Sequence, residues 1–210
     1  MFVRDQMIQD VITVTPATSV PEALKIMQEH SIKRLPVMQS EKLVGILTES
    51  ALLKVSPSPA TSLSIFEINF LVAKMTVKEV MTKKPFTISP DATIEEAALL
   101  MRNKKISGLP VVENGKLIGI ISESDLFDAM IELFGLKRAG KRLTVEVKDI
   151  PGVLAQLANI LKGLNINIIN VGNRKREDGT VDLIIRLDIT DETKCVAALA
   201  EHGFKVTHVN

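Results

Sequence analysis

Gly119-Ile120-Ile121-Ser122-Glu123-Ser124-Asp125 is the stretch on which the fold prediction depends, because a close copy of it occurs earlier in the chain. That copy, Gly45-Ile46-Leu47-Thr48-Glu49-Ser50-Ala51, also joins a glycine, an apolar strand and a hydroxyl three residues before the last position. Only the later stretch ends in a carboxylate. A hydroxyl and a carboxylate at this spacing, at the C-terminal end of a strand, can accept hydrogen bonds from a vicinal diol such as a ribose. The same residue types are also favoured at helix N-caps, so the stretch alone fits both roles.

The similarity extends over two whole segments, because residues 3–52 align with residues 77–126 without a gap. Related residues keep one register throughout, as in Leu35-Pro36-Val37 against Leu109-Pro110-Val111. Chance similarity between two ordinary α/β segments would not hold one register over this length. The sequence therefore predicts two equivalent structural repeats.

Each repeat has the pattern of a β-α-β-β-α unit. An apolar, β-branched segment is followed by a helix with apolar residues at helical spacing, two short strands and a second helix. Asn114-Gly115 between the strands of the second repeat is a strong hairpin signal. The expected strands are residues 11–14, 35–38 and 43–47 in the first repeat and 86–88, 109–112 and 117–121 in the second.

The rest of the chain contains a linker and a further domain. Residues 61–74 have apolar residues at helical spacing and predict a linker helix, with Phe66 and Phe70 packing on the repeats or on a second chain. After a basic connector, residues 141–210 have the order β-α-β-β-α-β, which is the ferredoxin-like arrangement. The fold class is α+β, with the expected segments 1–55, 56–76 (linker helix), 77–135, 136–140 (connector) and 141–210.

Composition excludes several classes of partner. The 26 basic and 25 acidic residues give a net charge of +1, so no overall field favours nucleic acid or an anionic membrane. The chain lacks Trp and Tyr, which usually provide stacking platforms for single-stranded nucleic acid. A single cysteine and no apolar run of membrane-spanning length favour a cytoplasmic protein. The three histidines lack metal-ligand spacing, so no metal site is expected.

No catalytic residues are expected. The sequence contains no Ser/His/Asp set, P-loop or dinucleotide glycine fingerprint. Glu49 and Glu123 recur in the two repeats, but they follow the pattern of exposed residues in the first turn of a helix. Cys195 lies inside an amphipathic helix, which favours an inert thiol.

Two repeats with a Thr/Ser-Pro start, a Leu-Pro-Val strand and a Gly-hydrophobic-hydrophobic-Thr/Ser-x-x-Asp end resemble a tandem CBS-domain pair, or Bateman module. Residues 141–210, with Asp149-Ile150-Pro151-Gly152-Val153-Leu154, resemble an ACT domain. The order of the domains resembles that of the bacterial acetoin utilization protein family. This family name is not in itself evidence of a role in acetoin metabolism.

The CBS resemblance implies an adenine nucleotide, or a related adenosyl ligand, bound in a cleft between the repeats as a regulatory ligand and not as a required cofactor. It implies that Ser122 and Asp125 hold the ribose, that Lys33 and Arg34 face a phosphate, and that Met7, Ile8, Ile12 and Ile120 form the apolar walls. The strand start of the other repeat faces the same ligand, which gives Ile32-Lys33-Arg34-Leu35-Pro36. The mirror-related site has Ala51 in place of the carboxylate, and Ser107 and Gly108 in place of the cations. We therefore expect one competent site and one weak or empty site.

The ACT resemblance implies side-by-side pairing of two copies and leaves two roles open, binding of a small amino acid or dimerisation alone. The helix after Pro151 also offers free backbone N–H groups to an anion. The candidate ligand residues are Asp149, Gly152, Val153 and Leu154, with Asn165, Ile166, Asn167 and Ile168 from the facing strand.

These features favour a non-catalytic regulatory sensor that forms a homodimer and acts on an unidentified regulated protein. Two alternatives stay open, a dimerisation scaffold with vestigial pockets and an enzymatic component of acetoin catabolism. Titration with nucleotides separates the sensor from the scaffold, and turnover of an acetoin-related substrate would support the enzyme.

Overall fold

The computed structural model describes residues 1–55 and 74–210, with the side chains of residues 53–55 excepted. The chain forms two compact units, Met1–Phe127 and Asp128–Asn210. The division falls inside α7 (Glu123–Leu133), and the end of the second repeat at residue 135 stays a prediction. The linker helix expected at residues 61–74 falls, except for its last residue, outside the described part of the chain.

The N-terminal unit contains two hairpins with matching irregularities. β1 (Arg34–Gln39) pairs with β2 (Lys42–Thr48), and β4 (Gly108–Glu113) pairs with β5 (Lys116–Ser122), both antiparallel. A register shift occurs at equivalent places, between Val37 and Met38 and between Val111 and Val112. The helices are α1 (Val3–Gln6), α2 (Val20–Glu29) and α3 (Glu49–Val55) in the first repeat, and α5 (Val77–Val80), α6 (Ile94–Lys104) and α7 in the second. The predicted duplication is therefore confirmed in three dimensions.

The hairpin turns show how the two repeats meet one backbone requirement with different residues. Asn114 and Gly115 have φ values of 51° and 78°, the left-handed pair that a two-residue hairpin turn needs. Ser40 and Glu41 adopt the same conformation, with φ values of 47° and 64°, although neither is a glycine. The Asn-Gly signal was a correct prediction, whereas the Ser-Glu turn follows only from the duplication.

The first element of each repeat differs from the sequence prediction. The strands expected at residues 11–14 and 86–88 form only isolated bridges, Val14 with Val37 and Ile88 with Val111. Each repeat begins instead with a four-residue helix, α1 or α5, which the sequence analysis did not anticipate. A β-branched segment was thus mistaken for a regular strand, because periodicity cannot show whether a partner strand is available.

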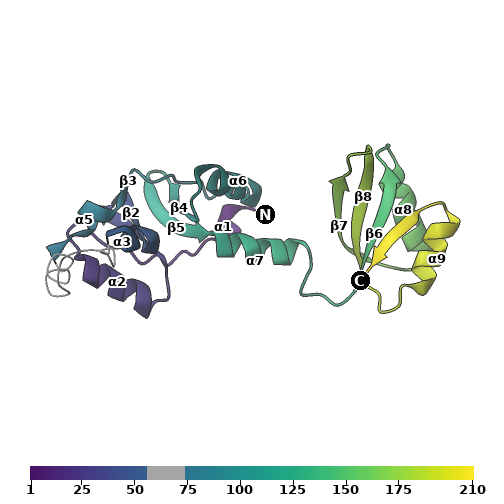
Figure 1. The fold of residues 1–210 in the computed structure, drawn as a ribbon, viewed down its shortest axis with the longest axis horizontal. Coiled ribbons are helices and arrows are strands. Elements are labelled where there is room, and N and C mark those ends of the chain that lie inside the picture. The colour runs from purple at the N-terminus through teal and green to yellow at the C-terminus, as the bar shows by residue number, and fades with distance from the viewer. Residues whose placement is uncertain (56–73) are drawn as a thin grey trace, which may run out of the picture. The chain divides into compact units, whose positions relative to one another are not determined.

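The two short helices cross from one repeat to the other. The Val3 amide donates to the Ala92 carbonyl at 2.8 Å, and the Val77 amide donates to the Thr18 carbonyl at 2.9 Å. Val3 and Val77 are both fully buried. Figure 1 shows α1 beside β5 and α5 beside the first hairpin, where β3 (Thr82–Lys83) also pairs with β2. Because each repeat completes the packing of the other, we infer that the two repeats fold as one cooperative unit.

The C-terminal unit has the predicted β-α-β-β-α-β order. Its elements are β6 (Lys141–Lys148), α8 (Val153–Gly163), β7 (Ile168–Lys175), β8 (Thr180–Leu187), α9 (Thr193–Glu201) and β9 (Lys205–Val209). The antiparallel sheet has the order β7-β8-β6-β9, and both helices cover one face (Figure 1). Alternate strand residues such as Val145, Leu183 and Ile185 pack against Leu157, Leu161 and Leu199 of the helices. The period-2 pattern of the strands thus places the core between the sheet and its helices.

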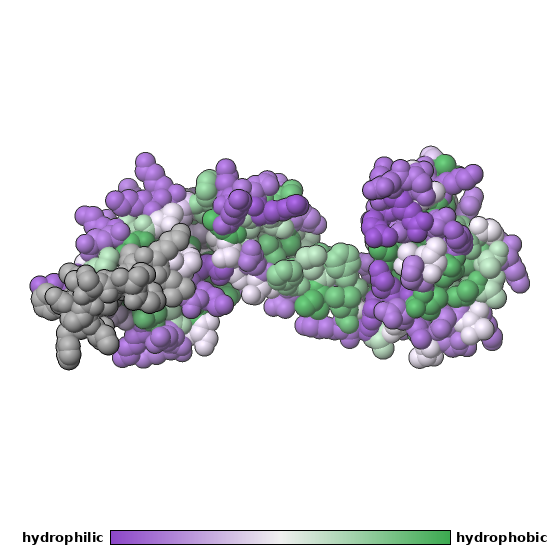
Figure 2. Space-filling view, in the orientation of Figure 1, coloured by the Kyte–Doolittle hydropathy of each residue, from purple (hydrophilic) through white to green (hydrophobic). Residues whose placement is uncertain are grey.

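The opposite face of this sheet buries one carboxylate among cations. Asp182 has a side chain that is 1% exposed, and its oxygens lie 2.6 Å from Arg174 Nη2 and 2.8 Å from Arg176 Nε. Arg176 also reaches Glu146 at 2.7 Å, so the two carboxylates and two guanidinium groups form one network. Hydrophilic side chains gather at the end of β7 and β8 where the turn between the two strands lies (Figure 2). Chiefly through the hydrogen bond from Arg174, the pKa of Asp182 is lowered from its ordinary value.

This shift predicts a pH dependence of stability. A carboxylate with a lowered pKa in the folded state stabilises the fold above its unfolded pKa, about 3.9, and the contribution is lost as the pH falls through the folded value. Asp182→Asn should therefore lower the melting temperature of the C-terminal unit at pH 7 and lower it less at pH 3. Thermal unfolding followed by NMR signals of this unit measures the difference. An equal decrease at both pH values would contradict the proposed role of the ion pairs.

Candidate functional site

The candidate site lies where the start of the first repeat meets the end of the second hairpin. Ile8 and Ile120 exchange backbone hydrogen bonds of 2.9 and 3.0 Å, which hold the segment after α1 against β5. A side chain at Gly119 would collide with this segment, because its Cβ would lie 2.6 Å from Met7 Sδ. Gly45 has the same relation to Met81 Sδ in the mirror-related position. The glycine of each repeated stretch therefore allows the crossing segment to approach closely.

Ser122 and Asp125 are joined to each other at the junction of β5 and α7. Both the backbone amide and the hydroxyl of Ser122 donate to Asp125 Oδ2, each at 2.7 Å. This is a helix-capping arrangement, so the cap interpretation of the sequence is correct as far as it goes. Both bonds use the same carboxylate oxygen of Asp125. The other oxygen, Oδ1, makes no hydrogen bond within the described residues, so it can accept one from a ligand.

Arg34 of the first repeat lies against Gly108 of the second repeat. A Cβ at Gly108, its equivalent in the second repeat, would lie 2.7 Å from Arg34 Nε, so the arginine occupies the space over this glycine. Burial lowers the pKa of Arg34, while the negative charges of Glu123 and Asp125 act in the opposite direction. The cation of one repeat is thus close enough to the carboxylates of the other to interact with them electrostatically.

These groups line a cavity of about 400 Å³. It contains seven of the eleven residues expected from the sequence: Ile8, Ile32, Lys33, Arg34, Ile120, Ser122 and Asp125. Its other lining residues are Ser31, Glu123 and Ser124. Glu123 and Ser124 belong to the repeated stretch itself, and their position next to Ser122 is the signal that could have placed them in the site; the sequence pattern of Glu123 had indicated only an exposed residue in the first turn of a helix.

The other four expected residues do not line this cavity. Met7 packs over Gly119, and Ile12 is half-buried against the core of the first repeat. Leu35 is fully buried in that core, and Pro36 is a buried residue of β1. Strand alternation explains the position of Leu35, which points to the side of β1 opposite Arg34, whereas Pro36 shares the side of Arg34 but is buried.

The mirror-related position has a different set of polar groups. Thr48 Oγ1 accepts from the Ala51 amide at 3.2 Å and lies 3.0 Å from the Ser50 hydroxyl. The threonine therefore caps its helix without a carboxylate partner at residue 51. Gly108 leaves no side chain in place of the arginine. One of the two mirror-related positions thus has the cap alone, whereas the other has the cap and the carboxylate of the second repeat and the facing cation of the first.

The residues expected from the ACT resemblance lie in two groups at opposite ends of α8. Asp149 and Gly152 precede the helix, where Asp149 pairs with Lys175 at 3.1 Å and Gly152 has a φ of 89°. Asn165, Ile166, Asn167 and Ile168 follow the helix and line a shallow cavity of about 470 Å³ with Ala158 and Lys162. The helix has 11 residues and is therefore roughly 16 Å long. One chain does not bring these two groups together.

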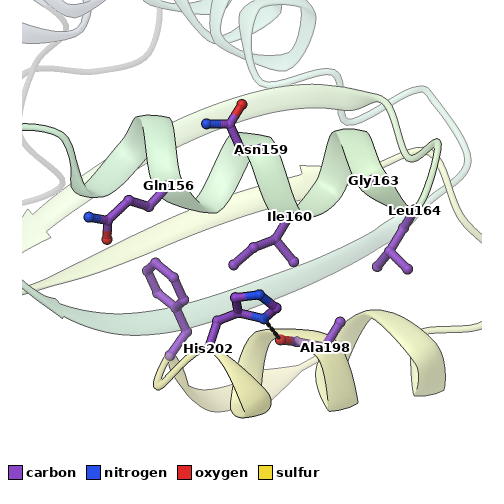
Figure 3. A pocket seen from close by; sticks show the side chains of 8 residues that line it. Gln156, Asn159, Ile160, Gly163, Leu164, Ala198 and His202 are labelled. Atoms are coloured by element: carbon purple, nitrogen blue, oxygen red, sulfur yellow. Dashed lines mark hydrogen bonds between the residues drawn. The ribbon is translucent and has the colours of Figure 1, made fainter.

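A groove between α8 and α9 was not anticipated from the sequence (Figure 3). Its volume is about 560 Å³, and its lining includes Gln156, Asn159, Ile160 and Leu164 from one helix side and Ala198 and His202 from the other. His202 Nδ1 lies 2.8 Å from the Ala198 carbonyl, which turns the imidazole along the helix. The helical period of the sequence indicates that these residues lie on the exposed faces of α8 and α9. The packing of the two helices against each other then places them along one groove.

Three further observations concern reactive groups, metal binding and membrane insertion in the described residues. Cys195 is 1% exposed, and burial raises the pKa of its thiol, which opposes formation of the nucleophilic thiolate. The described residues include no group of three or more His, Cys, Asp or Glu side chains placed to hold a metal ion. In the same part of the chain, no helix combines the length and apolar character needed to cross a membrane.

The fold and the site define a duplicated α+β module followed by a ferredoxin-like domain. Residues 3–58 and 77–132 match the CBS domain, and residues 139–210 match the TTHA0829-like ACT domain. The chain belongs to the CBS-domain family, as a tandem CBS pair with a C-terminal ACT domain. The resemblance inferred from the repeated motifs is confirmed.

Curated relatives match mainly through the CBS pair. An inosine-5'-monophosphate dehydrogenase from Korarchaeum cryptofilum is 34% identical over 172 residues, which cover 81% of this chain and 33% of that enzyme. A CBS domain-containing protein from Dictyostelium discoideum is 33% identical over 135 residues, or 63% of this chain and 93% of that protein. The chain thus spans about a third of the length of the dehydrogenase.

Solved structures support the same assignment. CBSX2 of Arabidopsis thaliana, solved in complex with AMP, is 32% identical with a TM-score of 0.54, over 63% of this chain and 97% of that chain. The CBS pair of protein MJ0100, solved with 5'-methylthioadenosine and S-adenosyl-L-methionine, is 29% identical with a TM-score of 0.52, over 62% and 99%. An acetoin utilization protein from Vibrio cholerae is 28% identical with a TM-score of 0.54, over 65% and 95%.

Proposed function

We propose that this protein is a non-catalytic regulator that binds one adenine nucleotide, or a related adenosyl ligand, in the cavity between Arg34 and Asp125. The observation that carries the proposal is the juxtaposition of a serine–aspartate pair from one repeat and a Lys-Arg pair from the other around a cavity of about 400 Å³. The complexes of CBSX2 with AMP and of MJ0100 with adenosyl compounds support the choice of ligand.

Each lining group has a role suited to this ligand. Asp125 and Ser122 accept hydrogen bonds from the ribose hydroxyls, since an ionised carboxylate is a strong acceptor. Lys33 and Arg34 bind the phosphate of a nucleotide or the carboxylate of an adenosyl amino acid, because a guanidinium group can engage either through two parallel hydrogen bonds. Ile8, Ile32 and Ile120 provide apolar contact for the adenine. No further cofactor is required.

Regulation follows if the ligand favours one arrangement of the chain over another. A bound ligand can shift such an equilibrium only by its difference in affinity for the two states, typically about 1–3 kcal/mol for coupled sites. The first turn of α7 lines the cavity, and the same helix continues past Phe127 into the residues of the C-terminal unit. We place the path of coupling to a regulated protein along this helix.

The protein acts as a cytoplasmic homodimer in this proposal. Exposed apolar residues of α7, among them Phe127 at 64% and Met130 at 45%, offer a surface for a second copy (Figure 2). Side-by-side pairing of two ACT domains, which the family resemblance implies, would bring the residues before α8 of one copy near the residues after α8 of the other and so assemble the predicted amino-acid site. Light scattering that gives the mass of a monomer would contradict this part of the proposal.

The test of the function is calorimetric titration of the purified chain with AMP, ATP, S-adenosylmethionine and GMP. Saturable binding of at least one adenosyl compound, with GMP much weaker, is the expected result. A chain that binds none of them would support the scaffold alternative. Turnover of a nucleotide or of an acetoin-related substrate would instead support an enzyme.

Arg34→Ala separates the phosphate contact from the rest of the site. The variant should bind AMP about tenfold or more weakly, because it loses a charge-assisted hydrogen bond, yet it should bind adenosine with unchanged affinity. Arg102→Ala, which removes an exposed arginine of α6, is the matched control and should bind both as the wild type does. Equal weakening for AMP and adenosine would show that Arg34 does not face the phosphate.

A further inference from the structure

Two rows of cross-strand residues on the open face of the C-terminal sheet differ in their charge. In one row, Asp182 of β8 lies opposite Glu146 of β6 and Arg174 of β7. In the other row, Arg186 of β8 lies opposite Arg142 and Asn170 in the same strand order. The first row contains its own counter-charges, whereas the second places two guanidinium groups side by side.

The second row leaves hydrogen-bonding capacity unused. Like charges directly opposite each other on neighbouring strands are unfavourable. Arg186 Nε is buried and makes no hydrogen bond within the described residues, and none of the ion pairs described for this part of the chain includes Arg142. Buried polar groups in folded proteins normally have a partner, so a buried guanidinium N–H without one indicates a place for an acceptor.

The structure already fixes the surroundings of these arginines. Arg186 Nη2 donates to the Arg138 carbonyl at 2.8 Å, and Asn170 Nδ2 donates to the Leu133 carbonyl at 2.9 Å. These bonds hold the segment after α7 against the sheet. The result is a cavity of about 200 Å³ lined by Phe134, Leu136, Arg142, Asn170, Ile184 and Arg186.

The lining predicts the chemistry of a ligand. Arginine binds a carboxylate through a bidentate fork, and Phe134, Leu136 and Ile184 favour a ligand with a hydrocarbon body. The described lining includes no acidic side chain, so the ammonium group of an amino acid would find no counter-charge. The volume is smaller than the roughly 300–1,000 Å³ of sites for drug-sized molecules, which indicates a ligand of few atoms.

We propose that Arg142 and Arg186 bind a small organic monocarboxylate with an apolar body on the open face of the C-terminal sheet. This site is separate from the adenosyl cavity and from the two ends of α8, and it does not depend on the proposed function. It would give the C-terminal domain a ligand class different from the amino acids that its family resemblance implies.

The test is an NMR titration of the full chain with isovalerate, valine and inorganic phosphate, which observes the Nε–H signals of the arginines. Isovalerate should shift the signals of Arg142 and Arg186, while valine and phosphate should bind much more weakly. Arg142→Gln should weaken isovalerate binding by about tenfold or more, because the variant loses a charge-assisted hydrogen bond. Arg142 is exposed, so this variant should retain its fold.

Lys194→Gln, at an exposed position of α9, is the control for a general loss of positive charge and should bind isovalerate as the wild type does. The proposal is overturned if isovalerate leaves both arginine signals unchanged across its soluble range. It is also overturned if valine or phosphate binds as tightly as isovalerate, or if Arg142→Gln binds with unchanged affinity.

Discussion

Replacing Asp125 with alanine is expected to weaken binding of the adenosyl ligand by about a hundredfold or more. The carboxylate is proposed to accept hydrogen bonds from both ribose hydroxyls, and each hydrogen bond to a charged group contributes about 1.5–3 kcal/mol. The change also removes the acceptor of the Ser122 amide, so the variant should lose about 1 kcal/mol of folding stability as a helix cap is lost. Calorimetric titration and urea unfolding measure the two effects separately.

Two further variants distinguish ligand binding from capping. Asp125→Asn keeps an acceptor for the Ser122 amide but lacks the charge, so it should recover most of the stability and little of the affinity. Asp128→Ala removes an exposed carboxylate one turn further along α7 and should change neither. If Asp125→Ala binds the ligand as tightly as the wild type, the residue is a helix cap only and the assignment of the site is wrong.

Gly119→Ala is expected to have the second large effect, on both stability and binding. A Cβ at this position would lie 2.6 Å from Met7 Sδ and 3.1 Å from the Ile8 carbonyl oxygen, so the Met7 side chain must reorient and the Ile8 carbonyl must shift by a few tenths of an ångström. Overpacking of this kind typically costs about 1–3 kcal/mol. Because Ile8 lines the cavity, its displacement should also weaken ligand binding. Urea unfolding and titration of the same sample measure both consequences.

Gly172→Ala is the matched control for this substitution. It changes another strand glycine, but no atom lies within 4 Å of its added Cβ, so stability should change by less than about 0.5 kcal/mol. Unchanged stability and binding in Gly119→Ala would show that the first segment does not pack on the second hairpin as described. It would also remove the physical reason for a glycine in each copy of the repeated stretch.

Much of the fold was predictable because the chain contains the same pattern twice. The gap-free alignment identified the hairpins and the long helices, and the hydrophobic alternation of residues 141–210 gave the whole ferredoxin-like order. The four-residue helices α1 and α5 were missed because they are too short to show a helical period. Their crossing between repeats depends on tertiary contacts of Val3 and Val77, which no local pattern contains.

The candidate site was predictable where it depends on the duplication. The repeat alignment paired Asp125 with Ala51 and Arg34 with Gly108, and the structure places the two charged members around one cavity. The inclusion of Leu35 and Pro36 came from treating a continuous strand segment as if all its residues faced the ligand. The groove between α8 and α9 could not be found from the sequence, because it depends on the packing angle of two helices that are far apart in the chain.

The most direct test of the central claim is the stoichiometry of binding, measured by equilibrium dialysis of the full chain with AMP and with S-adenosylmethionine. The structure brings a carboxylate and facing cations together at only one of the two mirror-related positions of the described residues, so we predict that the preferred ligand saturates at one molecule per chain. Asp125→Ala should lose that molecule. Saturation at two molecules per chain would contradict the asymmetry of the two sites, and an absence of saturable binding of either ligand would contradict the proposed function itself.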